Sequence, residues 1–286
     1  MSIVITGATG QLGRLTVESL LAQGIPAEQI IATGRRTEVL ADLAERGVVV
    51  RRADFNDSAS LREAFAGAEK LLLVSGTEPG RVQQHANVIN AAKAAGVRFI
   101  AYTSAVRADK SSLLLMADHR ATEELLAASG VPHALLRNAW YLENYTDQLP
   151  VYLDRGIVGA TGTARVSAAT RADYADAAAA VLTDEGHEGA AYELGGQPFT
   201  MTELAEAVSA ASGQTVTYTD LPVEQYQAVL VSAGVPEPVA ALLADNERGA
   251  AAGELAVESD DLEKLIGRAP TTYQQAVTAA VAALRA

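Results

Sequence analysis

The sequence predicts an α/β fold: a doubly wound parallel sheet with helices on both faces, together with a smaller, mostly helical C-terminal lobe. Strand-like apolar runs alternate with helical patterns through the first half of the chain, as in sheets built from βαβ units. A glycine-rich turn joins the first run to the first helical pattern, and the alternation becomes irregular after about residue 150. With 286 residues, of which 49% are apolar, the chain can bury a sizeable core.

The strands are expected at short apolar runs, most of which end in small or polar residues: 2–6, 29–33, 48–52, 70–75, 97–103, 131–136 and, completing the sheet, 190–194. Helical patterns separate the first six runs, most clearly at 81–95, and another helix is expected at 111–129. Further helices are expected in the lobe at 201–212, 223–234, 236–250, 259–266 and 272–285. The predicted domains are therefore 1–150, with a sheet completed by about 165–195, and a lobe at 151–286, mainly 196–286.

Residues 2–13, S-I-V-I-T-G-A-T-G-Q-L-G, carry the most informative motif of the chain. Its glycines Gly7, Gly10 and Gly13 follow the first strand and open the first helix. In such motifs the glycines make a tight turn, let the backbone approach a pyrophosphate and allow close packing, while the helix N-terminus offers free N–H groups. The motif, a relative of G-x-G-x-x-G, predicts a Rossmann-type dinucleotide-binding domain. The alternative is a strand–helix turn that binds no ligand.

The end of the second strand indicates which dinucleotide is bound. NAD sites usually place an acidic residue there to hold the ribose 2′-hydroxyl, whereas this chain has Arg35 and Arg36 and no acid. A guanidinium suits a 2′-phosphate through paired, charge-assisted hydrogen bonds. The cofactor expected is therefore NADPH, and the alternative for the arginine pair is a solvated turn.

Asp54 and Phe55 follow the third strand and are expected to flank the adenine. An acidic residue at this place can instead serve a turn or cap the next helix. Asp57 and Ser58 are better candidates for that cap, which leaves Asp54 free.

Composition excludes several classes of function. A formal charge of −13 opposes binding to nucleic acid, which needs clustered lysines and arginines. Cysteine is absent, and the four histidines show no metal-ligand spacing, so no metal site is expected. Neither a leader-like segment nor an apolar run long enough to span a membrane is present. The expected location is the cytoplasm, without a membrane partner.

None of the nine tyrosines is followed four residues later by a lysine, so the usual proton-donating pair of ketone reductases is missing. The helix expected at 111–129 carries His119 and Glu123 instead, either of which is a candidate acid–base group or simply a solvated side chain.

Residues 137–145, R-N-A-W-Y-L-E-N-Y, combine amide, aromatic and acidic side chains just beyond a strand end. Ligands of open parallel sheets bind at such ends, and Ser104 and Asn138 stand at two of them. The segment is a candidate wall for nicotinamide and substrate. Alternatively, Trp140 and Tyr141 fill the seam between sheet and lobe.

These features together resemble the NmrA-like family of atypical short-chain dehydrogenase/reductases. Within that family, the chain is similar to the type-2 NADPH:quinone oxidoreductases and the triphenylmethane dye reductases. The matching segments cover essentially the whole chain: 5–13, Arg35, 70–75, 84–97, 99–104, 135–145, 169–175 and 259–267.

The resemblance implies an NADPH-binding Rossmann domain, a small lobe and a cleft between them. It places phosphate contacts at Gly7 through Gly13, including Thr9, Gln11 and Leu12, and the 2′-phosphate contact at Arg35. It places nicotinamide-side contacts at the following residues: Ser75, Gly76, Thr77, Asn138, Trp140, Tyr141, Glu143 and Arg171.

The expected function is NADPH-dependent hydride transfer to quinones or similar electrophilic aromatic acceptors, with His119, Asn144 and Tyr141 as candidate catalytic residues. The alternatives are a triphenylmethane or azo dye reductase and a regulator that binds NADP(H) without turnover, because the resembled family includes such members. The partner expected is a small aromatic acceptor such as a quinone, and a homodimer is the candidate assembly.

Overall fold

The computed structural model describes residues 1–76 and 78–285. Thr77, one of the expected cofactor contacts, lies outside the described residues.

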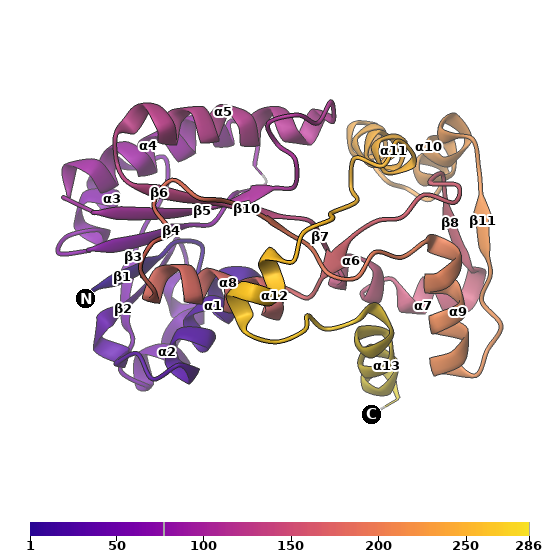
Figure 1. Ribbon diagram of the computed structural model, residues 1–286, viewed down its shortest axis with the longest axis horizontal. Coiled ribbons are helices and arrows are strands. Elements are labelled where there is room, and N and C mark those ends of the chain that lie inside the picture. The colour runs from indigo at the N-terminus through magenta and orange to yellow at the C-terminus, as the bar shows by residue number, and fades with distance from the viewer. Residues whose placement is uncertain (77, 286) are drawn as a thin grey trace.

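A seven-stranded sheet forms the centre of the N-terminal half, in the order β10-β6-β5-β4-β1-β2-β3 (Figure 1). Its strands, in chain order, are β1 (Ile3–Ile5), β2 (Ile30–Gly34), β3 (Val49–Arg52), β4 (Lys70–Leu73), β5 (Phe99–Ala105), β6 (His133–Asn138) and β10 (Ala191–Leu194). Every neighbouring pair is parallel. The chain builds outward from β1 in both directions, so the predicted doubly wound sheet is confirmed. Each strand begins and ends within two residues of its expected position.

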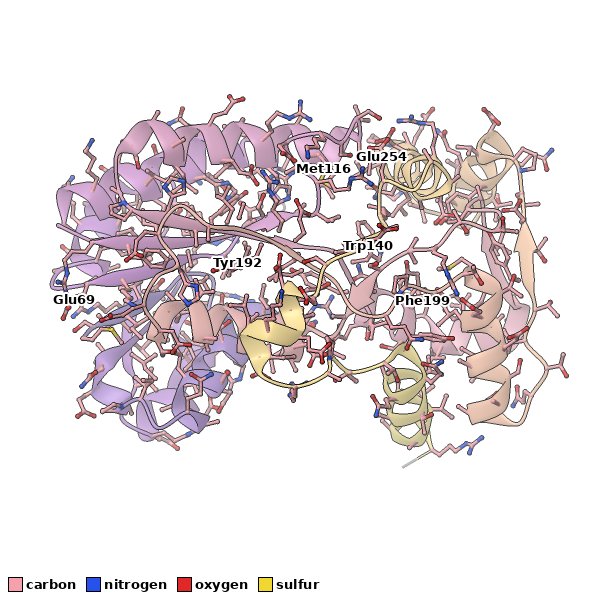
Figure 2. The ribbon with its side chains drawn as sticks, viewed as in Figure 1. Glu69, Met116, Trp140, Tyr192, Phe199 and Glu254 are labelled. Atoms are coloured by element: carbon pink, nitrogen blue, oxygen red, sulfur yellow. The ribbon has the colours of Figure 1, made fainter. Side chains whose placement is uncertain are left out.

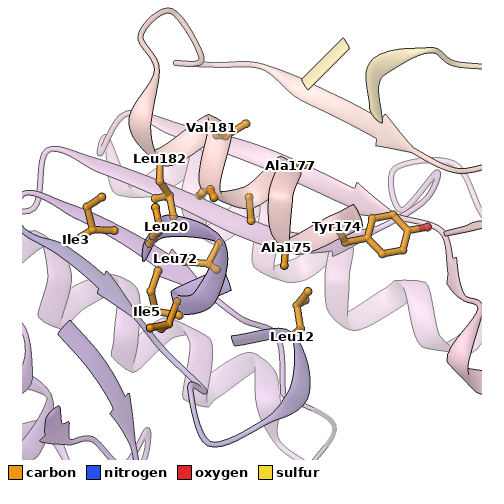
Figure 3. Close-up of a cluster of buried hydrophobic side chains, with 14 of the residues drawn as sticks. Ile3, Ile5, Leu12, Leu20, Leu72, Tyr174, Ala175, Ala177, Val181 and Leu182 are labelled. Carbon is orange, nitrogen blue, oxygen red and sulfur yellow. The ribbon is translucent and has the colours of Figure 1, made fainter. Parts of the chain in front are cut away.

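Helices cover both faces of this sheet (Figure 1). One face carries α3 (Ser58–Ala64), α4 (Arg81–Ala94) and α5 (Leu114–Ser129), and the other carries α1 (Gln11–Ala22), α8 (Arg171–Thr183) and the short α12 (Asp261–Ile266). Successive side chains of a strand point to opposite faces. Leu72 therefore packs with Leu20 and Leu182 (Figure 3), while Leu71 and Leu73 belong to a second core under α3, α4 and α5. Short helical turns η1 (Ala27–Gln29), η2 (Thr37–Leu40) and α2 (Ala41–Glu45) complete this half.

The lobe has a third buried core of its own. Its elements are α6 (Glu143–Thr146), α7 (Leu149–Arg155), β8 (Ile157–Gly159), α9 (Met201–Ser212), β11 (Tyr218–Asp220), α10 (Val223–Ser232), α11 (Glu237–Ala251) and α13 (Tyr273–Leu284). Strands β8 and β11 pair in parallel. A second short pair, β7 (Trp140–Tyr141) with β9 (Ala168–Ala169), lies where the chain passes from sheet to lobe. The mostly helical C-terminal portion agrees with the prediction.

Helices α6, α7 and α8 and the two short strand pairs were not predicted. Nine of the 13 residues of α8 are buried, because it lies between the sheet and α1 or α12. A helix buried on most of its sides has no polar stripe, so the periodicity that reveals surface helices is absent. Strands of two or three residues are too short to show an alternating pattern.

Candidate active site

A pocket opens at the carboxyl edge of the sheet, where the strand order reverses around β1. Its walls come from the turns after β1, β2, β3 and β4: Gly7, Thr9, Gly10, Gly34, Arg35, Ala53, Asp54, Phe55, Asn56, Val74, Ser75, Gly76, Glu78 and Gln84. A switch point of this kind is where open α/β sheets bind their ligands. Eight of the expected cofactor contacts are in this set, and Gln11, Leu12 and Gly13 follow directly in the first turn of α1.

The glycine turn fits the shape of a phosphate cradle. Gly7 has φ of +61°, a left-handed conformation that glycine adopts without strain. A Cβ on Gly13 would lie 2.4 Å from the Gly7 carbonyl oxygen, so this glycine lets α1 pack against the turn. A Cβ on Gly10 would meet only that same oxygen, at 3.3 Å. No described side chain caps α1, which leaves its N-terminus available to an anion.

Arg35 stands at the end of β2 with its guanidinium half in solvent. Its Nη2 donates to Glu78 Oε1 at 2.7 Å, and both residues line the pocket. Asp54 also lines the pocket, but its Oδ1 accepts the N–H of Asn56 at 3.0 Å, so it serves the turn as well. Asp57 caps α3 as expected, accepting from the N–H groups of Ala59 and Ser60.

Hydrogen bonds fix the backbone of Ser75 and Gly76, which follow β4. The Ser75 N–H donates to Thr103 Oγ1 at 2.9 Å, and the Gly76 N–H donates to His85 Nε2 at 3.2 Å. Arg81, which is 6% exposed, donates from Nη1 to the Gly76 carbonyl at 3.2 Å and from Nε to Asp118 at 2.8 Å. The pocket wall at Ser75 and Gly76 is therefore fixed from beneath by β5, α4 and α5.

His85 is a fully buried member of this support. Its Nδ1 lies 2.9 Å from Thr122 Oγ1, and the Thr122 hydroxyl donates to the Asp118 carbonyl. Nδ1 is therefore the protonated nitrogen, and Nε2 is free to accept from Gly76. Burial, with the nearby Arg81 charge, lowers the pKa of His85 to about 4, so the imidazole stays neutral.

His119 is not on the helix surface. It is 5% exposed, and its Nδ1 lies 2.9 Å from the hydroxyl of the buried Tyr102. Burial is the largest of the causes that lower the pKa of His119 to about 3. The alternative of a solvated histidine is wrong, and the structure does not bring His119 to the pocket wall.

Ser104 and Glu123 belong to a buried ion-pair network behind the sheet. The Ser104 hydroxyl donates to Glu123 Oε1 at 2.6 Å, and Arg137 donates to both oxygens of the same carboxylate. Ser104 thus faces α5, away from the turn that follows β1. Sequence reasoning could not foresee this, because the partners are 19 and 14 residues from Glu123 and share no local pattern.

Beyond the pocket, strand β7 forms the seam between sheet and lobe. Tyr141 packs against the core under α1 and α8. Trp140 packs against the lobe core, and Figure 2 labels it between the sheet and the lobe. The Arg171 guanidinium lies 4.9 Å from the centre of the Tyr141 ring. Its Nη2 donates to Asn144 Oδ1 at 3.2 Å, and its backbone N–H donates to Glu143. The expected wall residues are therefore brought together, and the seam-filling alternative for the two aromatics also applies.

Two buried polar atoms at this wall lack a hydrogen-bond partner among the described residues: Asn138 Oδ1 and Arg171 Nη1, which lies 3.8 Å from Glu143 Oε2 in an ion pair. One is a hydrogen-bond acceptor and the other a donor. Buried polar atoms are rarely left unpaired in native proteins, so the pair indicates a place for a ligand. A carboxamide has N–H donors and a carbonyl acceptor, so it carries a complementary group for each of these atoms.

Glu78 and the supporting pair His85 and Arg81 were missed by sequence reasoning. Glu78 is followed by Pro79 and Gly80, and nothing in the sequence distinguishes it from a solvated carboxylate. Within residues 1–76 and 78–285, no helix is long and apolar enough to cross a membrane. The same residues contain no group of three or more side chains that could hold a metal ion.

Known proteins resemble this chain over its whole length. The model of the NmrA-like family matches residues 1–272. Quinone oxidoreductase 2 of Escherichia coli (strain K12) is 49% identical over 279 residues, which are 96% of this chain and 97% of that protein. The crystal structure of the E. coli NADPH-dependent quinone oxidoreductase complexed with NADPH superposes with a TM-score of 0.93 at 48% identity, covering 99% of this chain and 100% of that chain. Triphenylmethane reductase of Citrobacter sp., complexed with NADP(H), superposes with a TM-score of 0.92 at 43% identity, covering 98% and 100%.

Proposed function

Because the chain belongs to the NmrA-like family, we propose that it is an NADPH-dependent oxidoreductase that reduces quinones or similar electrophilic aromatic compounds. The structural observation that carries the proposal is the pair of buried atoms without a hydrogen bond, Asn138 Oδ1 and Arg171 Nη1; Asn138 ends β6, at the carboxyl edge of the sheet that also carries the glycine turn. When bound, NADPH supplies the hydride. The residues of the chain hold the cofactor and stabilise charge on the acceptor.

Each part of the site has a separate role in holding the cofactor. The turn of Gly7, Gly10 and Gly13 and the free end of α1 receive the pyrophosphate. Arg35 receives the 2′-phosphate. Asp54 and Phe55 flank the adenine, and Asn138 with Arg171 orients the carboxamide.

Tyr141 and Asn144 are the side chains we assign to the acceptor. Burial raises the pKa of Tyr141, so its hydroxyl stays protonated and can donate a hydrogen bond. Asn144 uses Oδ1 for Arg171 and keeps its amide N–H groups to donate. His119 is bonded to Tyr102 and does not line this wall, so the donor role rests on Tyr141 and Asn144.

Hydrogen-bond donors of this kind suit quinones better than ketones. A quinone that accepts hydride becomes a phenolate with a pKa of about 10, which hydrogen bonds stabilise adequately. An aliphatic ketone becomes an alkoxide of far higher basicity and requires a general acid. We therefore expect quinone turnover and negligible turnover of aliphatic ketones.

The test is NADPH consumption by the purified full-length protein with matched panels of quinones and aliphatic ketones. Steady oxidation of NADPH with quinones is expected. Efficient ketone reduction would overturn the donor assignment, and NADPH binding without turnover of any quinone would favour a cofactor-sensing regulator.

Reduction of triphenylmethane dyes is a second candidate activity, favoured by the similarity to the Citrobacter reductase. Hydride addition to the carbon of such a cation neutralises it and needs no proton. The wall of Trp140, Tyr141 and Tyr145 offers ring surface against which the rings of an aromatic cation can pack.

We also propose a cytoplasmic homodimer that does not bind nucleic acid. The absence of cysteine is compatible with any redox environment, and the charge of −13 opposes association with a polyanion. Exposed valines on α10 and α11, Val229, Val231 and Val239, supply apolar surface that a dimer would cover. Light scattering of the purified protein tests the dimer, because a monomeric mass would contradict it.

A further inference from the structure

Arg35, the residue that receives the 2′-phosphate in the proposed function, is paired with a carboxylate from the opposite wall of the pocket. Arg35 follows β2, and Glu78 lies in the turn between β4 and α4. Arg35 Nη2 and Glu78 Oε1 are 2.7 Å apart, and both side chains line the cavity.

The position of Glu78 is set by its attachment to the protein. It lies two residues after Gly76, whose N–H is held by His85 and whose carbonyl is held by Arg81. It lies three residues before Arg81, which is nearly buried and bonded to Asp118 and the Leu115 carbonyl. Glu78 therefore stands in the sequence between two fixed residues, and its carboxylate lies within hydrogen-bond distance of Arg35.

This pairing has opposite consequences for the two nicotinamide dinucleotides. A 2′-phosphate must take the guanidinium from Glu78 and then lie close to a charge of its own sign. A 2′-hydroxyl carries no charge and can donate a hydrogen bond to a carboxylate, which is how NAD sites hold the ribose. Glu78 thus supplies the kind of acid that is missing at the end of β2.

We propose that Glu78 is a cofactor-specificity residue that weakens the preference for NADPH over NADH by competing for Arg35. The inference rests on the proposed role of Arg35. The Arg35 and Glu78 side chains are 61% and 47% exposed, and ion pairs in solvent are weak. The expected effect on binding is therefore moderate, about three- to tenfold.

Calorimetric titration of the full-length protein with NADP⁺ and with NAD⁺ tests the proposal without turnover. In Glu78→Gln, NADP⁺ should bind about three- to tenfold more tightly, while NAD⁺ binding is unchanged or weaker. The matched control is Glu18→Gln, which removes the same charge and breaks another exposed pair, with Arg46 at 2.8 Å, away from the pocket. This control should leave both dissociation constants unchanged.

The double variant Glu78→Gln with Arg35→Ala distinguishes the proposed role of Glu78 from the proposed role of Arg35 on which it rests. If Glu78 acts through Arg35, most of the gain from Glu78→Gln disappears in Arg35→Ala. An unchanged ratio of NADP⁺ to NAD⁺ affinity in Glu78→Gln would overturn the role of Glu78, as would a gain that persists in full without Arg35. If Arg35→Ala alone binds NADP⁺ normally, the assignment of the 2′-phosphate to Arg35 fails instead.

Discussion

At the scale of single residues, the glycine turn contains two glycines that are needed for different reasons. Gly13 has no room for a side chain, since its Cβ would meet the Gly7 backbone at 2.4 Å, whereas Gly10 has a nearest neighbour at 3.3 Å. One position is therefore required for folding, and the other keeps space for the ligand.

We expect Gly10→Val to abolish dinucleotide binding with little change in the free energy of unfolding, because its side chain fills the pyrophosphate space. Gly13→Ala should lower the free energy of unfolding by about 1–3 kcal/mol, as overpacked sites do. Calorimetry with NADP⁺ and urea unfolding measure the two effects. Near-normal binding by Gly10→Val would mean that the turn is only structural.

The donors at the wall give a second prediction. Tyr141→Phe and Asn144→Ala should each slow quinone reduction about tenfold to a hundredfold, the usual effect of removing one donor to a developing oxyanion. Reduction of a cationic triphenylmethane dye should respond less, because no oxyanion forms. Steady-state rates with both acceptors decide this, and equal losses with quinone and dye would contradict the donor role.

His119→Ala provides the contrast. Since His119 is buried against Tyr102, its removal should mainly lower the free energy of unfolding, by about 2–4 kcal/mol. The rate of quinone reduction per folded molecule should change less than in Tyr141→Phe. If His119→Ala slows quinone reduction more than Tyr141→Phe does, the hydrogen-bond donor to the quinone is His119.

At the scale of elements, the N-terminus of α8 is a junction between sheet and lobe. Asp173 is fully buried in the first turn. It accepts hydrogen bonds from the Thr170 hydroxyl, from Arg268 Nη1 at 2.6 Å and from the Thr271 N–H at 3.0 Å. One carboxylate thus ties α8 to the segment that joins α12 and α13.

We predict that Asp173→Ala lowers the free energy of unfolding by about 2–3 kcal/mol, because the Thr271 N–H loses its buried acceptor, while the half-exposed Arg268 keeps its pair with Asp176. Asp154→Ala is the control: it breaks the exposed pair with Arg155 and should change stability by less than about 1 kcal/mol. Urea unfolding of the unmutated protein and of the two variants measures the difference. Equal free energies of unfolding would show that the Asp173 junction does not contribute to stability.

A structural feature could be predicted from the sequence where neighbouring residues determine it, and could not where it depends on residues far apart in the chain. The strands and the glycine turn could be predicted because apolar runs and glycine spacing are properties of neighbouring residues. Arg35 could be predicted for the same reason, since it directly follows a strand. Its partner Glu78 is 43 residues away, and no pattern in the sequence reports such a contact. Ser104 shows the same limit, because its place at a strand end does not reveal that its hydroxyl donates to Glu123 on α5.

At the scale of the whole molecule, the two buried histidines make stability depend on pH. The pKa of an ordinary histidine is 6.5, whereas burial lowers that of His85 to about 4 and that of His119 to about 3. At a pH between the pKa of a histidine in the folded protein and 6.5, the unfolded chain binds more protons than the folded one. The free energy of unfolding therefore rises with pH in this range. The contribution is fully present above pH 6.5 and is lost as the pH falls towards the folded values.

We therefore expect the free energy of unfolding to fall by roughly 1.5 kcal/mol for each of these histidines between about pH 6.5 and 5. His85→Gln keeps an acceptor for Gly76 and a donor for Thr122, and should flatten the part of the slope due to His85. Chemical unfolding across this pH range measures the slope. A stability that does not change there would refute the buried, neutral state of both side chains.

The interleaving of the two cores has a consequence for how the protein is made. The core under α1 and α8 begins with Ile3 and still requires Leu262, while the lobe core already uses Val106 and is complete only with Val281. Domains commonly fold in turn as they leave the ribosome, but here the core under α1 and α8 is complete only after most of the lobe has been synthesised. The nascent chain must therefore keep both of these apolar faces apart until synthesis is almost over, and in a chain stalled before Leu262 only the core under α3, α4 and α5 is complete.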